Sequence, residues 1–105
     1  MAKILQRTIS WDPSPATDVV GYNLYWAVGA DAVVDYLSDH ANVGNKTNVV
    51  IPDDVAKFPL VEDVMSLGVT AFDDIGNESD MTSVQNVPFD FVAPDAPTNL
   101  VVGTL

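Results

Sequence analysis

Apolar and polar positions alternate along most of this chain, and the alternation restarts after each cluster of turn residues. Stretches rich in Val, Ile, Tyr and Trp are separated by clusters of Asp, Pro, Gly and Asn at about ten-residue spacing. No long segment repeats its apolar residues with the period of a helix. The pattern predicts an all-β antiparallel sandwich.

The first predicted strand ends at Trp11. Period-two alternation places Leu5, Ile9 and Trp11 on one face, with Arg7 sharing that parity near the rim. The other face receives Ile4, Gln6, Thr8 and Ser10. Two prolines in residues 12–15 then stop the strand, because proline cannot donate a hydrogen bond to a ladder.

Residues 20–28 predict a second strand with two different faces. Tyr22, Leu24 and Trp26 share one face, which we expect to lie in the core. The opposite face carries Asn23, Tyr25 and Ala27. Tyr25 is therefore expected to be an exposed aromatic residue.

The segment 29–46 has the weakest pattern, and we expect irregular structure there. Its apolar residues suit either a short strand or a single helical turn: Val33, Val34, Tyr36 and Leu37. Residues 47–51 return to a strand pattern, closed by Pro52-Asp53-Asp54. Leu60 is expected to anchor the crossover that follows.

The second half of the chain has clearer strands. Residues 64–73 alternate regularly, with Met65, Leu67, Val69 and Ala71 predicted to point inward. Residues 74–77 form the turn, because Gly and Asn tolerate positive φ. Residues 81–91 supply the last strand, and Pro88 within it indicates an edge position or a bulge. Residues 92–97 predict a stiff, extended connector.

These segments together resemble the fibronectin type III domain in its bacterial and phage form. Ile9-Ser10-Trp11-Asp12-Pro13 resembles its second strand, and Gly21-Tyr22-Asn23-Leu24-Tyr25-Trp26 its third. The sixth strand and the loop after it are similar to residues 69–79, the most specific block. Residues 94–102 resemble the proline segment and first strand of a following repeat.

The resemblance implies an immunoglobulin-like sandwich over residues 1–92, followed by a connector and strand over residues 93–105. It says little about function, because such domains serve as spacers, adhesion modules and virion parts. The family's sixth strand usually carries a tyrosine whose hydroxyl closes a corner. Met65 stands at the matching position, so that hydrogen bond is expected to be missing.

The two ends of the sequence suggest assembly. Too few residues precede Ile9 to form another strand, so we expect the family's first strand to be missing. The tail then offers a donor strand for another copy: Asn99, Leu100, Val101 and Val102. The expected acceptor edge consists of Leu5, Arg7 and Ile9. Two alternatives stay open, a fragment with a disordered tail and a tail that folds back onto its own domain.

Charge and composition narrow the choice of partner. Fifteen Asp and Glu residues against four Lys and Arg give a formal net charge of −11. Such a charge repels phosphate backbones and anionic lipids, so neither nucleic acid nor a membrane surface is expected as a partner. The acidity either keeps the protein soluble before assembly or matches a basic partner. Without cysteine, neither a disulfide nor a thiolate metal site is available.

The sequence also bears on location. No apolar run reaches the roughly 20 residues that span a bilayer. The residues before Thr8 lack the apolar stretch of a secretory signal peptide. We therefore expect no membrane insertion, and together with the resemblance this favours a virion or an extracellular surface assembly.

Catalytic chemistry finds little support in the sequence. His40 is the single histidine, and no serine lies in a nucleophile-elbow motif, so we expect no enzyme and no cofactor. Acidic residues in turns keep a calcium site open as a lesser alternative: Asp53, Asp54, Asp73, Asp74 and Asp80.

Two functions follow as hypotheses. The first is a non-enzymatic structural module that assembles head to tail, by exchange of its C-terminal strand, or decorates a larger particle such as a phage virion. The second is a carbohydrate- or cell-surface-binding accessory domain of a secreted bacterial enzyme or adhesin. Exposed aromatic rings would then stack on sugar; the candidates are Tyr25, Tyr36 and Phe72.

Overall fold

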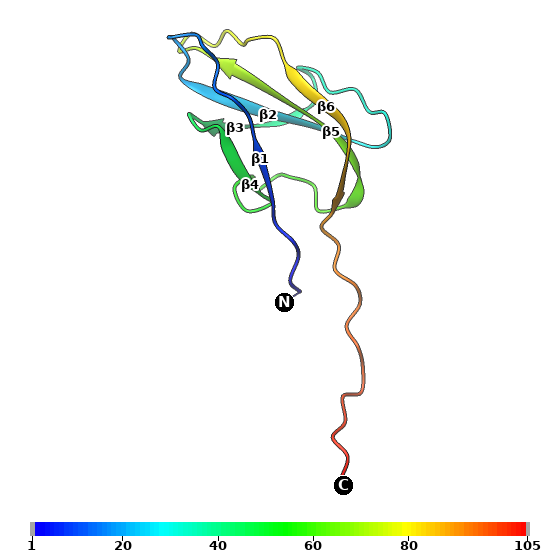
Figure 1. Ribbon diagram of the computed structural model, residues 1–105. Helices are drawn as coiled ribbons and strands as arrows, with labels where there is room; N and C mark the ends of the chain where they lie inside the picture. The colour runs from blue at the N-terminus through cyan, green and yellow to red at the C-terminus, as the bar shows by residue number, and fades with distance from the viewer. Residues whose placement is uncertain (1, 105) are drawn as a thin grey trace.

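The computed structural model describes residues 2–104 and is all-β (Figure 1). Six strands form two antiparallel sheets, one with the order β1-β4 and the other with the order β3-β2-β5-β6. The strands are β1 (Arg7–Ser10), β2 (Gly21–Val28), β3 (Asp39–Gly44), β4 (Asn48–Ile51), β5 (Glu62–Phe72) and β6 (Thr82–Asp90). The predicted all-β sandwich is confirmed at this level.

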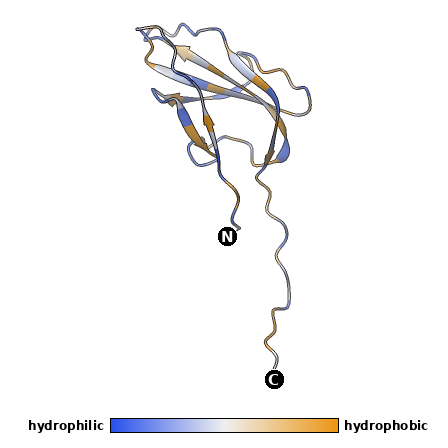
Figure 2. Ribbon diagram, viewed as in Figure 1, coloured by the Kyte–Doolittle hydropathy of each residue, from blue (hydrophilic) through white to orange (hydrophobic). Residues whose placement is uncertain are grey.

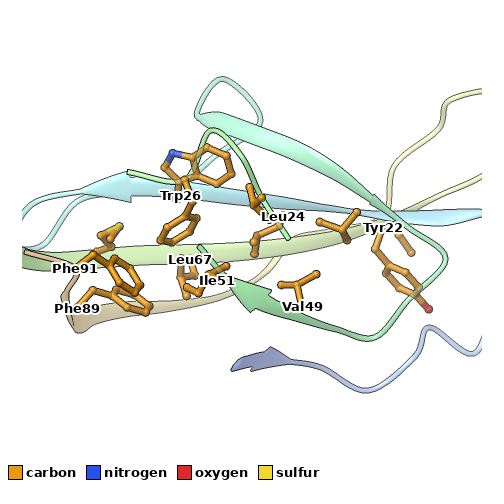
Figure 3. Close-up of a cluster of buried hydrophobic side chains, with 13 residues drawn as sticks. Tyr22, Leu24, Trp26, Val49, Ile51, Leu67, Phe89 and Phe91 are labelled. Atoms are coloured by element: carbon orange, nitrogen blue, oxygen red, sulfur yellow. The ribbon is translucent and has the colours of Figure 1, made fainter. Parts of the chain in front are cut away.

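The core lies between the two sheets (Figure 3). The inward faces predicted for β2 and β5 are confirmed, since Leu24, Trp26, Met65 and Leu67 are all buried. At one end the core is aromatic: the rings of Trp26 and Phe58 lie 5.3 Å apart, and those of Phe58 and Phe89 lie 5.8 Å apart. Burial of these large side chains supplies most of the driving force for folding.

The outer face of the four-stranded sheet is also covered. The loop over residues 29–38 crosses it, and Ser66 on β5 donates a hydrogen bond of 2.5 Å to the carbonyl of Ala32. Tyr36, from the same loop, packs edge-on against Tyr25 with ring centroids 6.1 Å apart. Tyr25 is only 1% exposed, so its predicted exposure was wrong. Alternation gave the correct face of the strand, but not the loop that buries it.

The segment 29–46 contains a strand that the sequence pattern did not predict. β3 pairs antiparallel with β2, with Tyr25 opposite His40. Of its six residues, only Val43 is buried. The strand therefore depends on hydrogen bonding to its neighbour rather than on its own apolar periodicity. Val33 and Val34 belong to no strand, while Tyr36 and Leu37 lie in a single turn that is closed by a hydrogen bond of 3.0 Å from the Ser38 N–H to the Asp35 carbonyl.

The predicted turn and edge signals near the end of the chain are confirmed. Asp73 accepts hydrogen bonds from the backbone N–H groups of Ile75, Gly76 and Asn77, and Gly76 has a φ of 105°. β6 is the edge strand beside β5, and its ladder contains a register shift. Pro88 lies within it, as expected for an edge.

β1 is shorter than predicted. It begins at Arg7, and Leu5 before it is 74% exposed, so the expectation that Leu5 points into the core was wrong. Ile4 instead packs partly against the core. The alternation ends because residues 2–6 belong to no ladder, and without a ladder their faces are not fixed.

Both ends of the described chain leave the sandwich at the same pole (Figure 1). Phe91 is buried, but residues 92–104 form no strand and run away from the domain. The molecule therefore measures 70 Å along its long axis and 27 and 19 Å across. Leu100 is 98% exposed, which contradicts the alternative in which the tail folds back. Hydrophobic residues reappear near the end of the tail (Figure 2).

Candidate functional site

The free edge of β1 is the first component of the candidate site. The Trp11 N–H donates to the Thr47 carbonyl at 2.9 Å, in line with the β1-β4 register. Hydrogen-bonded and non-hydrogen-bonded pairs alternate along an antiparallel ladder, so Arg7 and Ile9 also direct their backbone groups toward β4. Thr8 and Ser10 direct theirs away from it. Within residues 2–104, no hydrogen bond reaches the N–H of Thr8 or Ser10.

The other sheet edges carry features that discourage pairing. On β4, Asp54 closes the edge from both sides: its carboxylate accepts from the Val50 N–H and its own N–H donates to the Val50 carbonyl, both at 2.7 Å. β6 contains Pro88, and Asn86 in it has a φ of 57°. On β3, the side chain of Asn42 caps the Gly44 N–H. In the described chain, β1 shows no comparable protection against an added strand.

An apolar groove runs beside this free edge, between β1 and β6. Its upper part is a hollow of about 130 Å³ bounded by Ile9, Trp11, Leu24, Leu67, Val69 and Val84. A second hollow of about 450 Å³ lies next along β1 and has a mixed lining, with Leu5, Val64, Pro88 and Phe89 beside the charged Arg7, Glu62, Asp63 and Asp90. Core side chains such as Leu24, Leu67 and Phe89 thus line hollows on the side of β1 where the described residues place no further strand.

Arg7 crosses the second hollow, the lower part of the groove. Its guanidinium donates a hydrogen bond of 3.1 Å to the Pro88 carbonyl and lies 5.1 Å from the centre of the Phe89 ring. These contacts link the two sheets on their open side. The three predicted acceptor residues, Leu5, Arg7 and Ile9, therefore all border the groove, although Leu5 lies outside the strand.

Trp11 carries an unusual polar atom at the upper end of the groove. Its indole Nε1 is buried and has no hydrogen-bond partner among the described residues. Buried N–H groups without an acceptor are rare in folded proteins. Trp11 borders the hollows on both sides of this end, so the orphaned donor lies next to the unoccupied edge.

The predicted donor segment lies in the extended tail, away from the domain. Leu100, Val101 and Val102 are 98%, 80% and 92% exposed. Leu100 and Val102 share one parity, so in an extended strand both would face the same side. Asn99 has a φ of 55°, a left-handed conformation that asparagine adopts more readily than most residues.

A second polar cluster covers the outer face of the four-stranded sheet. The Tyr25 hydroxyl donates to Glu78 at 2.6 Å, and the Thr70 hydroxyl donates to the same carboxylate oxygen at 2.5 Å. The His40 ring stacks on Tyr25 with centroids 4.8 Å apart. Burial, followed by the hydrogen bond to Glu78, raises the pKa of Tyr25 to about 12. Burial opposes ionisation of Glu78, but the hydrogen bonds from Thr70 and Tyr25 outweigh it and lower the pKa of that carboxyl.

Of the three aromatic residues considered for sugar binding, none stands free. Tyr25 is buried, and the half-exposed Tyr36 donates its hydroxyl to the Ser79 carbonyl at 2.7 Å. Phe72 is partly buried, and its ring lies so close to Gly21 that a Cβ there would come within 2.5 Å of it. Tyr25 and Phe72 pack within the four-stranded sheet, and Tyr36 lies in the loop that covers it.

The acidic residues considered for calcium binding are not brought together. Asp54 caps β4, and Asp73 organises its own turn. Residues 2–104 contain no group of three or more His, Asp or Glu side chains placed to hold a metal ion. Within the same residues, no helix is long and apolar enough to cross a membrane.

Comparison with known proteins adds no relative. The chain matches no protein-family model, no curated protein and no solved structure. Functional interpretation therefore rests on the geometry of this molecule.

The main residues that the sequence did not identify are Thr8 and Ser10. Alternation placed both on the outer face of the sheet, and polar side chains on an outer face carry no signal of their own. Their importance lies in their backbone groups, whose direction depends on the register with β4. No pattern within residues 4–11 specifies that register.

Proposed function

We propose that this protein is a non-enzymatic assembly module whose β1 edge accepts the tail segment 98–102 of another copy. The observation that carries the proposal is an unpaired edge strand beside an apolar groove, in a molecule that also holds an apolar segment in solvent. Adding a strand to an exposed sheet edge is a common mode of protein recognition. Backbone groups of Thr8 and Ser10 would gain partners, and the groove would gain apolar side chains.

The arrangement of strands supports a fibronectin type III-like interpretation of this module. By the resemblance, β1, β2 and β5 correspond to the family's second, third and sixth strands. Among residues 2–104, no strand pairs with the outer edge of β1, the position that the resemblance gives to the family's first strand, and the tail resembles such a strand. We place the module in a larger particle or filament, with a phage virion or an extracellular surface assembly as its setting.

The energetics favour a weak, concentration-dependent contact. Full burial of Leu100 and Val102 contributes roughly 1.5–3 kcal/mol each, and each new backbone hydrogen bond adds about 1 kcal/mol. Lost translational and rotational freedom costs an estimated 4–15 kcal/mol. The formal charge of −11 on each copy adds repulsion that salt screens. Assembly therefore requires high protein concentration or a particle that holds the copies together.

A complementation experiment tests the proposal. One variant lacks residues 98–105 and so retains the groove without a tail. The other, Thr8→Pro, retains the tail but loses an N–H donor at the free edge, where an exposed proline is tolerated. We expect each variant alone to sediment as a monomer at all concentrations, and their mixture to form a one-to-one heterodimer, because each supplies what the other lacks.

The control is the mixture of the tail-less variant with a Thr8→Pro chain that also carries Leu100→Asp and Val102→Asp. Leu100→Asp would place a carboxylate in the apolar hollow beside Ile9, and Val102→Asp would add another to the hollow that already holds Glu62, Asp63 and Asp90, so this mixture is expected to stay monomeric. Failure of the first mixture to form a heterodimer, with both variants folded by circular dichroism, would rule out strand donation.

The carbohydrate-binding alternative is not carried forward. It required freely exposed aromatic rings; of its three candidates, Tyr25 is buried, Phe72 is partly buried, and the half-exposed Tyr36 has its hydroxyl bonded to the Ser79 carbonyl. A Tyr25→Ala variant would remove a packed ring and its hydrogen bond to Glu78, so a loss of sugar binding could not be separated from a loss of stability.

A further inference from the structure

The direction of the tail restricts how two copies can meet. β1 runs from the pole where the tail leaves, here called the Arg7 end, toward the opposite pole, the Trp11 end (Figure 1). A strand that pairs antiparallel with β1 must therefore run from the Trp11 end to the Arg7 end. The tail already points away from its own Arg7 end, in that same direction. If a second copy lies beyond the tail in the same orientation as the first, the tail meets the Trp11 end of that copy and can pair antiparallel with its β1.

A copy in the inverted orientation would have to bind the tail in parallel with β1. Parallel pairing is slightly less stable per residue than antiparallel pairing, and both sheets of this protein are antiparallel. An inverted pair would also close on itself, because each tail would fill the other groove. Same-orientation stacking leaves one free groove and one free tail at the ends, so it continues.

The connector suits the same-orientation arrangement. Residues 92–98 contain two prolines and no glycine, a composition that favours an extended chain without reversal. From Phe91, eight residues reach at most about 28 Å to Asn99. That length separates two domains without requiring the tail to turn back.

The free edge then sets the register. Leu100 and Val102 must face the groove, so each lies opposite an inward-facing residue of β1. Within β1 these residues are Ile9 and Arg7, so Leu100 lies opposite Ile9 and Val102 opposite Arg7. Val101 then lies opposite Thr8, and Asn99 opposite Ser10. The backbone groups of Thr8 and Ser10 point to the free edge, so they can bond to the added strand. The alternative register, shifted by two residues, moves Leu100 to Trp11, beyond the end of β1.

Resting on the proposed function, we infer that copies stack in the same orientation into an open linear chain, with each tail antiparallel to the next copy's β1 and Val101 opposite Thr8. The occupant of the groove is thus a second copy of this protein, bound in one register. The ends of such a chain can extend without limit.

Cysteine cross-linking of the full-length chain tests this inference, since the protein has no cysteine of its own. In the proposed register, the Cα atoms of residues 8 and 101 lie about 5.5 Å apart, within the range of about 4.4–6.8 Å that disulfides require. Thr8 and Val101 are both exposed, and in the proposed register both side chains would point away from the groove. We expect Thr8→Cys/Val101→Cys to give a ladder of trimers and longer species on a non-reducing gel after mild oxidation.

The matched control is Ser10→Cys/Val101→Cys, which places equivalent residues on the same face two positions out of register. It should give at least tenfold less cross-linked product, and single-cysteine variants should give dimers at most. A ladder from the control pair instead would overturn the register while strand donation stands. A product that stops at the dimer in the double variant would overturn same-orientation stacking.

Three further outcomes show whether the inference fails alone or together with the proposed function. An internal disulfide within a monomer would overturn both, because the tail would then fill its own groove. No cross-link in either double variant, combined with a heterodimer in the complementation experiment, would overturn the register alone. No cross-link together with no heterodimer would overturn the function on which the inference rests.

Discussion

At the scale of single residues, Tyr25 shows how one buried hydroxyl connects three elements. It lies on β2, stacks on His40 of β3 and donates to Glu78 in the loop after β5. Thr70 shares the same acceptor. Together these contacts fix the outer face of the sheet opposite the core, so this cluster belongs to the fold and not to the interaction site.

The raised pKa of Tyr25 gives a pH-dependent prediction. Because the pKa in the folded state is about 12 against an ordinary 10.0, its stabilisation is complete below pH 10 and is lost as the pH rises toward 12. Tyr25→Phe removes the titrating group. Between about pH 9 and pH 11, we expect the wild type to lose about 1 kcal/mol more unfolding free energy than Tyr25→Phe. Equal losses in urea titrations of the two proteins would contradict this explanation of the pKa.

At the scale of elements, the four edges of the two sheets differ in how they are protected. Asp54 occupies both backbone groups of Val50 on the outer edge of β4, while no described residue does the same for β1. An edge that is closed by its own turn cannot accept another strand. The asymmetry explains why we assign the interaction to β1.

Asp54→Ala should therefore weaken the fold without affecting assembly. The Val50 N–H loses its carboxylate acceptor, at an expected cost of about 1 kcal/mol. Asp53→Ala is the matched control, because its exposed carboxylate contacts only the Gln6 side chain among the described residues. It should change stability by less than about 0.5 kcal/mol. Chemical denaturation of both variants checks the difference, and equal costs would contradict the role given to Asp54.

The elements that sequence alone predicted are those whose apolar periodicity is strong. β2 and β5 were placed correctly with their inward faces, because residues such as Leu24 and Leu67 alternate with smaller or polar neighbours. β3 was missed, because its stability comes from pairing with β2 and only Val43 contributes to the core. The burial of Tyr25 was missed because it depends on a loop that crosses the sheet, a long-range contact without a local pattern.

At the scale of the whole molecule, the shape is a sandwich with an open side and an extended tail. The apolar segment was predicted from sequence, and the structure places it in solvent. The groove itself was not predicted: Leu5, Arg7 and Ile9, which border it, were named only as an acceptor edge, and the direction of the backbone groups was not foreseen. The chain has a formal net charge of −11 and still exposes Leu100 and Val102; the proposed contact with another copy would bury both side chains.

Amide hydrogen exchange at Thr8 and Ser10 tests the central claim most directly. The measurement compares the chain truncated after Pro97 with the same chain in the presence of excess synthetic peptide spanning residues 97–105. We predict that exchange of both amides slows by at least about tenfold with peptide, while the Val50 amide, already bonded to Asp54, changes little. Unchanged exchange at Thr8 and Ser10 with peptide in excess would contradict the account.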